Sequence, residues 1–509
     1  MVVNLVLLGG VVAMVAVYGY RIVSNFLRFA CHLYFRKITV YGINNLPREG
    51  PVVVCPNHPN MFIDALLVVT ECTRMGRPPY AWAKASLFKQ PLMAKILKLL
   101  GAVPVFRPPK PTGLQDVDSD KTPEELAAAT RQMFKSTWDV LAKGNLVVLF
   151  PEGTSYTLPR MLNLRTGTMR VATGFVKEHD APITVVPLGL TYYNKDHFRS
   201  EVTLEYGTPI VIDQATIQST AFVADEHAEI KRLTELLQER MHGVTLNGND
   251  FSSFRIARMI RRLYVGGALS PKDDVHFTQQ LIDLVDGKLT TKETEQVVLD
   301  QLKADVVAYQ AKLDELRLKD ADLLVLVAEE SLLQLVLERL CYLMVLLPLA
   351  LPGVILNFPF YLIGNKLNEL AGFTESKSMF KLFAGMVLVP VQWVFLIGTS
   401  WYVYGSSAAY SVAIALPLCF YSHIRVLEES RSIMENVWFL GSIATRKDRV
   451  TKLRDERTQL ATTVKGVVDA LVKDPIMESV KKAVSPVHQQ TLRHRTKSRT
   501  DLTFMNSTS

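Results

Sequence analysis

The stretch that decides the fold reads Val52-Val53-Val54-Cys55-Pro56-Asn57-His58-Pro59-Asn60-Met61-Phe62-Ile63-Asp64. Its first four residues are apolar and mostly β-branched, which predicts a short buried strand. Two prolines then interrupt regular structure. Asn60 is suited to cap a helix that begins with Met61. We therefore expect His58 in the turn between a strand and a helix, with Asp64 about one turn into that helix.

His58 and Asp64 together form a candidate catalytic pair. A carboxylate in this position can hold an imidazole in one tautomer and stabilise its protonated form. Such a pair can act as the general base for a hydroxyl group. A turn histidine beside a solvated aspartate is the alternative interpretation, and the rest of the chain has to decide between them.

Between residues 35 and 215, short apolar runs alternate with helical patterns, as in an α/β domain. One helix is clearly indicated, because Thr122 and Glu125 form a capping box and Gly144 provides the stop. The expected strands are Lys37–Val40, Val52–Cys55, Tyr80–Lys84, Ala102–Phe106, Leu146–Phe150, Ile183–Leu190 and Glu201–Glu205.

Polar residues follow the predicted strand Leu146–Phe150. Glu152 and the backbone amides of residues 153–155 are placed to hold a polar substrate, and Gly153 permits a tight turn. Guanidinium groups suit phosphate because they offer paired donors. A surface turn with solvated arginines is the alternative. The candidate phosphate-binding arginines are Arg107, Arg160 and Arg165.

Apolar segments near both ends predict a membrane protein. Residues 1–22 contain an uncharged run long enough to cross a bilayer, and the arginines after it place the next domain in the cytosol. A cleaved signal peptide is the alternative. Prolines interrupt residues 340–364, so we expect either a membrane hairpin or a span there. Residues 380–422 predict two crossings.

The remaining segments are less informative. Residues 216–339 have a helical pattern, in which Phe254–Tyr264 carries four arginines. This stretch could lie on a membrane surface or pack on the preceding domain. Residues 423–509 predict a basic cytoplasmic tail with a disordered end. The net charge of +8 fits an anionic membrane or anionic substrates. The five cysteines show no metal or disulfide spacing.

Four stretches, in this order, resemble the motifs of the glycerolipid acyltransferase superfamily. The resemblance covers roughly residues 35–215, and its strength lies in the order and spacing of the four together. They are His58 with Asp64 (its His/Asp motif), Gly101–Arg107 (its Gly-Phe-Arg block), Phe150–Ser155 (its Phe-Pro-Glu-Gly block) and Val186-Pro187 (its last, proline-containing block).

The His/Asp motif departs from the common family pattern. Five residues separate His58 from Asp64, where the family usually has four. Neither spacing places both groups on one face of a continuous helix, so the turn must bring them together. The longer spacing and residues 102–107 look like the fungal-type glycerol-3-phosphate/dihydroxyacetone-phosphate acyltransferases, and the C-terminal apolar segments also suit that branch.

The resemblance implies an α/β acyltransferase domain, with a mixed sheet and flanking helices, plus a helical insert and transmembrane helices. It implies transfer of an acyl chain from acyl-CoA to the sn-1 hydroxyl of glycerol 3-phosphate or dihydroxyacetone phosphate. The enzyme would need no metal or cofactor, bind no nucleic acid, and lie in the endoplasmic reticulum membrane with this domain in the cytosol. A lysophospholipid (1-acyl-glycerol-3-phosphate) acyltransferase and a catalytically silent membrane scaffold are the alternatives.

His58 is then the predicted base and Asp64 its orienting group. Ser155 as a nucleophile is disfavoured, because the stretch lacks the Gly-x-Ser-x-Gly elbow. Pro187 is predicted to support acyl-CoA or the core. The predicted substrate-binding residues are Asn57, Lys84, Gly101, Arg107, Glu152, Gly153, Thr154, Ser155, Arg160 and Arg165.

Overall fold

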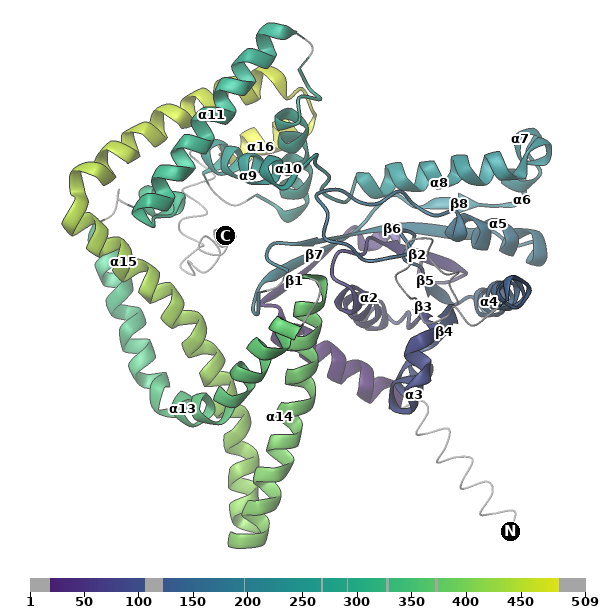
Figure 1. Ribbon diagram of the computed structural model, residues 1–509, viewed down its shortest axis with the longest axis horizontal. Helices are drawn as coiled ribbons and strands as arrows, with labels where there is room; N and C mark the ends of the chain where they lie inside the picture. Colours follow the sequence, from purple (N-terminus) through teal and green to yellow (C-terminus); the bar gives the residue numbers. More distant parts are fainter. Residues whose placement is uncertain are drawn as a thin grey trace. The chain divides into compact units, whose positions relative to one another are not determined.

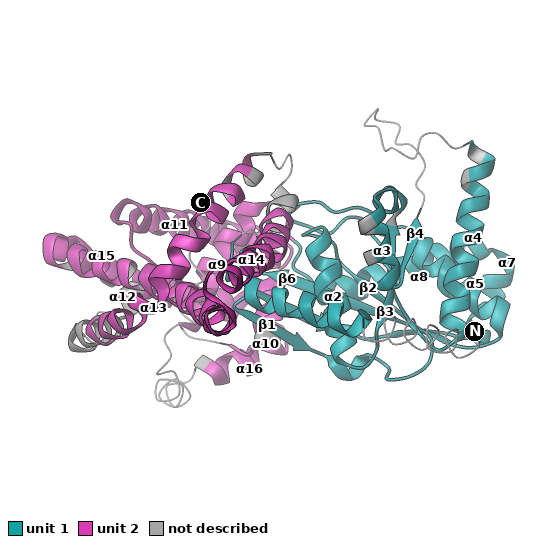
Figure 2. Cartoon of the chain, turned by 90° about the horizontal axis from the view of Figure 1, so that it is seen from below, with its two compact units in different colours: residues 1–247 teal, residues 248–509 magenta. Residues whose placement is uncertain are grey.

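The computed structural model describes residues 19–105, 122–195, 197–266, 269–290, 292–325, 329–370 and 374–484. The chain divides into two units, residues 1–247 and residues 248–509 (Figure 2). The sheet belongs to the first unit, whereas the second is helical wherever it has regular structure.

The first unit is built on a mixed sheet of eight described strands (Figure 1). The strand order is β1-β7-β6-β2-β5-β3-β4, and β8 pairs with β6. Strand β6 runs antiparallel to β7 and β8, and the other pairs are parallel. The strands are β1 Lys37–Tyr41, β2 Val52–Pro56, β3 Pro79–Lys84, β4 Ala102–Val105, β5 Leu146–Val148, β6 Ile183–Tyr192, β7 Glu201–Tyr206 and β8 Ile210–Ile212.

Helices flank this sheet. A core cluster joins apolar side chains of β2, β5 and β6 to those of α5 and α8, which fixes these helices against the central strands. Residues 19–34 are also helical. The other helices are α2 Phe62–Arg74, α3 Pro91–Leu99, α4 Pro123–Ala142, α5 Gly167–His179, α6 Gln214–Ile217, α7 Thr220–Ala224 and α8 Glu226–His242, with 3-10 turns η1 Ile43–Asn45 and η2 Ala85–Lys89.

The predicted mixed sheet with flanking helices is confirmed, and all seven predicted strands are present. The capping box of α4 is confirmed too: the Thr122 hydroxyl accepts the Glu125 N–H at 3.2 Å, and the Glu125 carboxylate accepts the Thr122 N–H at 2.8 Å. Two details differ. Strand β5 ends before Phe150, and the three-residue strand β8 was not predicted because it is too short to show a period.

The second unit contains eight described helices. They are α9 Phe251–Val265, α10 Pro271–Val285, α11 Glu293–Leu316, α12 Asp320–Val325, α13 Glu329–Leu370, α14 Thr374–Tyr404, α15 Ser406–Leu471 and α16 Ile476–Val484. Three segments within them are long and apolar enough to cross a membrane: Leu340–Gly364, Met379–Tyr404 and Ser406–Ser442. The last two are joined at Gly405, whose φ of 83° permits an abrupt reversal.

Helix α13 contains the segment for which both a hairpin and a span were predicted. Three prolines lie inside it, Pro348, Pro352 and Pro359. Each lacks a backbone donor and so favours a bend, and the ribbon of α13 in Figure 1 is bent rather than straight. Its length and hydropathy suit a span and its bend suits a hairpin, so both stay predictions. At the other end, residues 1–18 of the predicted first span lie outside the described residues.

Helix α9 contains the arginine-rich stretch for which a membrane-surface position and packing on the preceding domain were both predicted. Of its four arginines only Arg255 is exposed, and Arg261 is buried in an ion pair with Asp274. The helix packs on α10, α11, α15 and α16 within its own unit, so it is not a free surface helix. Within the predicted tail, residues 423–484 are largely helical and part of this unit. Residues 485–509 lie outside the described residues, and the cytoplasmic position of the tail stays a prediction.

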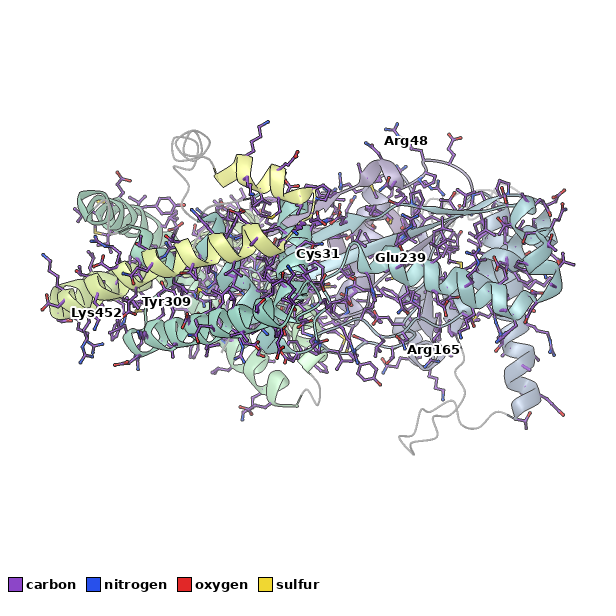
Figure 3. The ribbon with its side chains drawn as sticks, turned by 90° about the horizontal axis from the view of Figure 1, so that it is seen from above. Cys31, Arg48, Arg165, Glu239, Tyr309 and Lys452 are labelled. Atoms are coloured by element: carbon purple, nitrogen blue, oxygen red, sulfur yellow. The ribbon has the colours of Figure 1, made fainter. Side chains whose placement is uncertain are left out.

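A buried ionic group joins four helices of this unit. The Asp320 carboxylate accepts hydrogen bonds from Arg457 Nε at 2.8 Å, from Arg457 Nη2 at 3.0 Å and from the Tyr309 hydroxyl at 2.7 Å. Tyr309 is labelled among the side chains of Figure 3. Burial lowers the pKa of Arg262 to about 10, and the negative charge of Asp320 opposes that change. The Asp320 carboxylate therefore pairs with the buried Arg457 and also favours the charged form of the half-buried Arg262.

Candidate active site

The turn between β2 and α2 carries the candidate base. Helix α2 begins at Phe62, and Met61 precedes it with a φ of 47°. The prediction that Asn60 caps the helix is therefore wrong. Instead, the Asn60 N–H donates to Asp64 Oδ2 at 2.7 Å, so a carboxylate inside the first turn satisfies the backbone before it. The longer His/Asp spacing is absorbed in this turn.

His58 and Asp64 meet across the turn. His58 Nδ1 lies 2.9 Å from Asp64 Oδ2. The Asp64 side chain is fully buried, whereas that of His58 is 19% exposed. The imidazole stacks on the Phe150 ring, with centroids 4.1 Å apart. These contacts fix the ring plane, and they leave Nε2 as the nitrogen that a substrate can reach.

Glu152 holds the same turn from the other side. Its Oε1 accepts the His58 N–H at 2.7 Å, and its Oε2 accepts the Leu162 N–H at 2.9 Å. The side chain is buried, which raises the pKa of Glu152, although the two backbone donors oppose the rise. Because both oxygens have partners within the protein, the geometry favours a positioning part for Glu152 over the predicted contact with substrate.

Replacing Glu152 with glutamine should expose this role. The amide retains one acceptor oxygen but directs an NH₂ group at the second backbone N–H, so one bond is lost. We expect destabilisation of about 1–3 kcal/mol, the range for a buried donor left unsatisfied. Thermal unfolding of the purified variant measures this effect. Unchanged stability together with a higher KM would instead support the predicted substrate contact.

Three other predicted site residues join backbone segments around the turn. The Asn57 amide donates to Leu190 O at 3.1 Å and accepts the Leu190 N–H at 2.6 Å. The Ser155 hydroxyl accepts the Met61 N–H at 3.1 Å. Pro187 pairs with Cys55 in the β2–β6 register. These contacts align the turn with the end of β6. Each of the three residues therefore has a structural role in the turn or the sheet.

The two predicted glycines are required by the backbone. Gly101 and Gly153 have φ values of 73° and 72°, which side chains rarely adopt. A Cβ at Gly153 would also lie 2.8 Å from Cδ of Arg165. The positive φ of Gly153 and the nearby Arg165 side chain both favour glycine at this turn. Thr154, which follows, is half-buried.

The predicted cationic residues are placed unequally. Arg165 packs beside Gly153 while remaining largely exposed (Figure 3), and Arg160 is exposed five residues earlier. Arg107 lies outside the described residues. Lys84 ends β3, and its side chain is outside the description. The described structure thus brings one predicted guanidinium to the Glu152 turn.

Two residues near the pair were missed from the sequence. The Tyr192 hydroxyl donates to Asp64 Oδ1. Lys195 Nζ donates to Pro59 O at 3.1 Å and to the Thr157 hydroxyl at 2.5 Å. Both follow the predicted strand Ile183–Leu190. Since β6 runs parallel to β2, its end lies at the same sheet edge as His58, and that topology was the available signal.

The comparison with protein families settles what this domain is. Residues 37–191 match the family model described as Acyltransferase. These residues are an acyltransferase domain. The matched range contains His58, Asp64 and Phe150–Ser155, which confirms the resemblance drawn from the four motifs. In the second unit, residues 256–369 match the model of the glycerol-3-phosphate acyltransferase 2 C-terminal domain.

Curated relatives agree with both matches. Glycerol-3-phosphate O-acyltransferase 1 of Saccharomyces cerevisiae is 25% identical over an alignment of 456 positions that covers 74% of this chain and 59% of the relative. Glycerol-3-phosphate O-acyltransferase 2 of the same yeast is 25% identical over an alignment of 471 positions that covers 71% of this chain and 62% of the relative. The alignments thus span about three fifths of the length of these relatives.

The chain is also similar to a solved structure. It is the 1-acyl-sn-glycerophosphate acyltransferase PlsC of Thermotoga maritima, with 16% identity and a TM-score of 0.30, covering 45% of this chain and 80% of that one.

In the part of the chain that the structure describes, no group of three or more His, Cys, Asp or Glu residues could hold a metal ion.

Proposed function

We propose that this protein is a membrane-bound acyltransferase that moves an acyl chain from acyl-CoA to the sn-1 hydroxyl of glycerol 3-phosphate, with dihydroxyacetone phosphate as the alternative acceptor. The observation that carries the proposal is the His58–Asp64 contact, built into a matched acyltransferase domain. The names of the two yeast relatives and the C-terminal match support this acceptor.

In the proposed reaction His58 is the general base. Its Nδ1–H donates to Asp64, so Nε2 carries the lone pair that takes the acceptor's hydroxyl proton. The hydroxyl oxygen forms a bond with the thioester carbonyl carbon, and the carbon–sulfur bond then breaks. The CoA thiolate leaves and receives the proton from His58. Asp64 stabilises the transient imidazolium, in the manner of other carboxylate–histidine pairs.

The acceptor's phosphate needs cationic partners outside this pair. Arg165 is the described candidate, because it lies against the Glu152-Gly153 turn. Arg160 and Arg107 stay predictions from the sequence. Planar guanidinium groups bind phosphate through two parallel hydrogen bonds, which suits a small dianionic acceptor. Replacement of such a residue should therefore raise the KM for the acceptor more than the KM for acyl-CoA.

An acyl-transfer assay on the purified full chain tests the proposal. The protein in proteoliposomes receives labelled acyl-CoA with glycerol 3-phosphate, dihydroxyacetone phosphate or 1-acyl-glycerol 3-phosphate. We expect label in the monoacyl product of one of the first two acceptors. Exclusive use of the monoacyl acceptor would establish the lysophospholipid alternative. No transfer to any acceptor would support a silent scaffold, which the intact His58–Asp64 geometry disfavours.

We also propose that the domain faces the cytosol from the endoplasmic reticulum membrane, with the α14–α15 turn on the opposite side. A cysteine introduced at Ser407 should react with an impermeant label in sealed vesicles only after the membrane is opened. One introduced at Tyr156, which is exposed, should react at once. Labelling of position 407 in sealed vesicles would contradict the charge-based topology.

The native cysteines decide which variant the labelling experiment should start from. Cys341 is exposed and Cys419 half-buried, so both should be replaced by serine. Cys31, Cys55 and Cys72 are buried. Burial raises the pKa of Cys31 and of Cys72 to about 12, so these groups remain unreactive thiols at neutral pH.

A further inference from the structure

The Asp64 carboxylate is fully buried and has a partner on each oxygen. Oδ2 faces His58 Nδ1 at 2.9 Å and the Asn60 N–H at 2.7 Å. Oδ1 accepts the hydroxyl of Tyr192. A carboxylate rotates about its bond to Cβ unless both oxygens are held. The Tyr192 contact therefore holds the second oxygen and, together with the Asn60 N–H, keeps Oδ2 in line with the imidazole.

Tyr192 is itself held rigidly. It is the last residue of β6 and pairs with Val202 of β7, so its backbone is fixed by the sheet. Its ring lies 6.0 Å from that of Phe35, which is fully buried. Burial raises the pKa of Tyr192 well above its usual value, and the charge of Asp64 adds to the rise. The hydroxyl therefore stays protonated and serves as a donor across the range of assay pH.

We infer that Tyr192 is a positioning residue for acyl transfer, holding Asp64 so that Asp64 can orient His58. The inference rests on the proposed function of the His58–Asp64 pair. Tyr192 comes from a strand more than 120 residues after Asp64 and lies outside the four sequence motifs. It does not touch the reacting atoms, so its effect must pass through Asp64.

The variant Tyr192→Phe tests this. It keeps the ring against Phe35 and removes only the hydroxyl. We expect kcat to fall about 10-fold, the lower limit for losing a hydrogen bond to a charged group, with the KM values for acyl-CoA and acceptor unchanged. Tyr206→Phe is the matched control, because Tyr206 is a buried tyrosine of the same sheet whose hydroxyl contacts Cys72 rather than the pair. It should retain wild-type kcat.

A double-mutant cycle separates positioning from a general structural role. If Tyr192 acts through Asp64, Tyr192→Phe should have no further effect on the residual kcat of Asp64→Asn, whereas independent effects would multiply. A multiplicative effect would overturn the inference, as would loss of fold in Tyr192→Phe, since either makes the tyrosine structural.

The same experiment tests the role of Tyr192 and the proposed function separately. Wild-type kcat in Tyr192→Phe, with wild type active, would overturn the inference and leave the proposed function standing. Absence of acyl transfer by the wild-type protein would overturn the proposed function, and the role of Tyr192 with it. A 10-fold loss confined to kcat and absent from the Asp64→Asn background would support both.

Discussion

Replacing His58 with alanine should lower kcat by about 10²- to 10⁴-fold, the usual contribution of a general base. The loss should appear in kcat rather than in KM, because His58 acts on the acceptor's proton and not on its phosphate. The His58 side chain is partly exposed, and the hydrogen bond from the backbone N–H of residue 58 to Glu152 survives the substitution. The protein should therefore remain folded. Initial rates with labelled acyl-CoA, and thermal unfolding, measure the two expectations.

Two further variants provide a control and a second test of the His58–Asp64 pair. His227→Ala removes an exposed histidine of α8 and should leave kcat unchanged. Asp64→Asn keeps the side-chain shape but removes the charge that stabilises the imidazolium, so it should also lower kcat strongly. A His58→Ala enzyme that kept more than about a tenth of the wild-type kcat would contradict general-base catalysis by this residue.

The sheet could be predicted because local signals were strong. Val52 to Cys55 is apolar and β-branched, and the Thr122–Glu125 box marks a helix start through contacts three residues apart. Such patterns depend on near neighbours, which a sequence displays directly. The three-residue strand β8 shows no period, so only its pairing with β6 reveals it.

The site was predicted in its residues but not in its contacts. The sequence placed His58 near Asp64, yet the helix start at Phe62 and the bond from Asn60 to Asp64 arise from an unusual backbone at Met61. Glu152 was assigned to substrate, and its burial between two backbone donors could not be inferred without the fold. Tyr192 was missed because sheet topology, rather than spacing, brings it to Asp64.

In the second unit, removing the charge of Asp320 should be strongly destabilising. Asp320 is buried, and it faces Arg457 through two hydrogen bonds. Asp320→Asn would leave Arg457 buried without its counterion, and Arg262 would lose a compensating charge. Breaking a buried pair by removing one partner typically costs about 3–5 kcal/mol. Denaturant unfolding of the full chain in mild detergent measures this free energy.

Removing the cation Arg457 should lower the free energy of unfolding less than removing the charge of Asp320, because Asp320 has further partners. In Arg457→Met the carboxylate would retain the Tyr309 hydroxyl at 2.7 Å and the nearby positive charge of Arg262. The double variant should be less destabilised than the sum of the two, since each change removes the partner that the other leaves unpaired. Glu315→Gln, which breaks an exposed pair with Arg449, is the control and should have little effect. Equal losses in Asp320→Asn and Arg457→Met would show instead that Arg262 and Tyr309 do not stabilise Asp320.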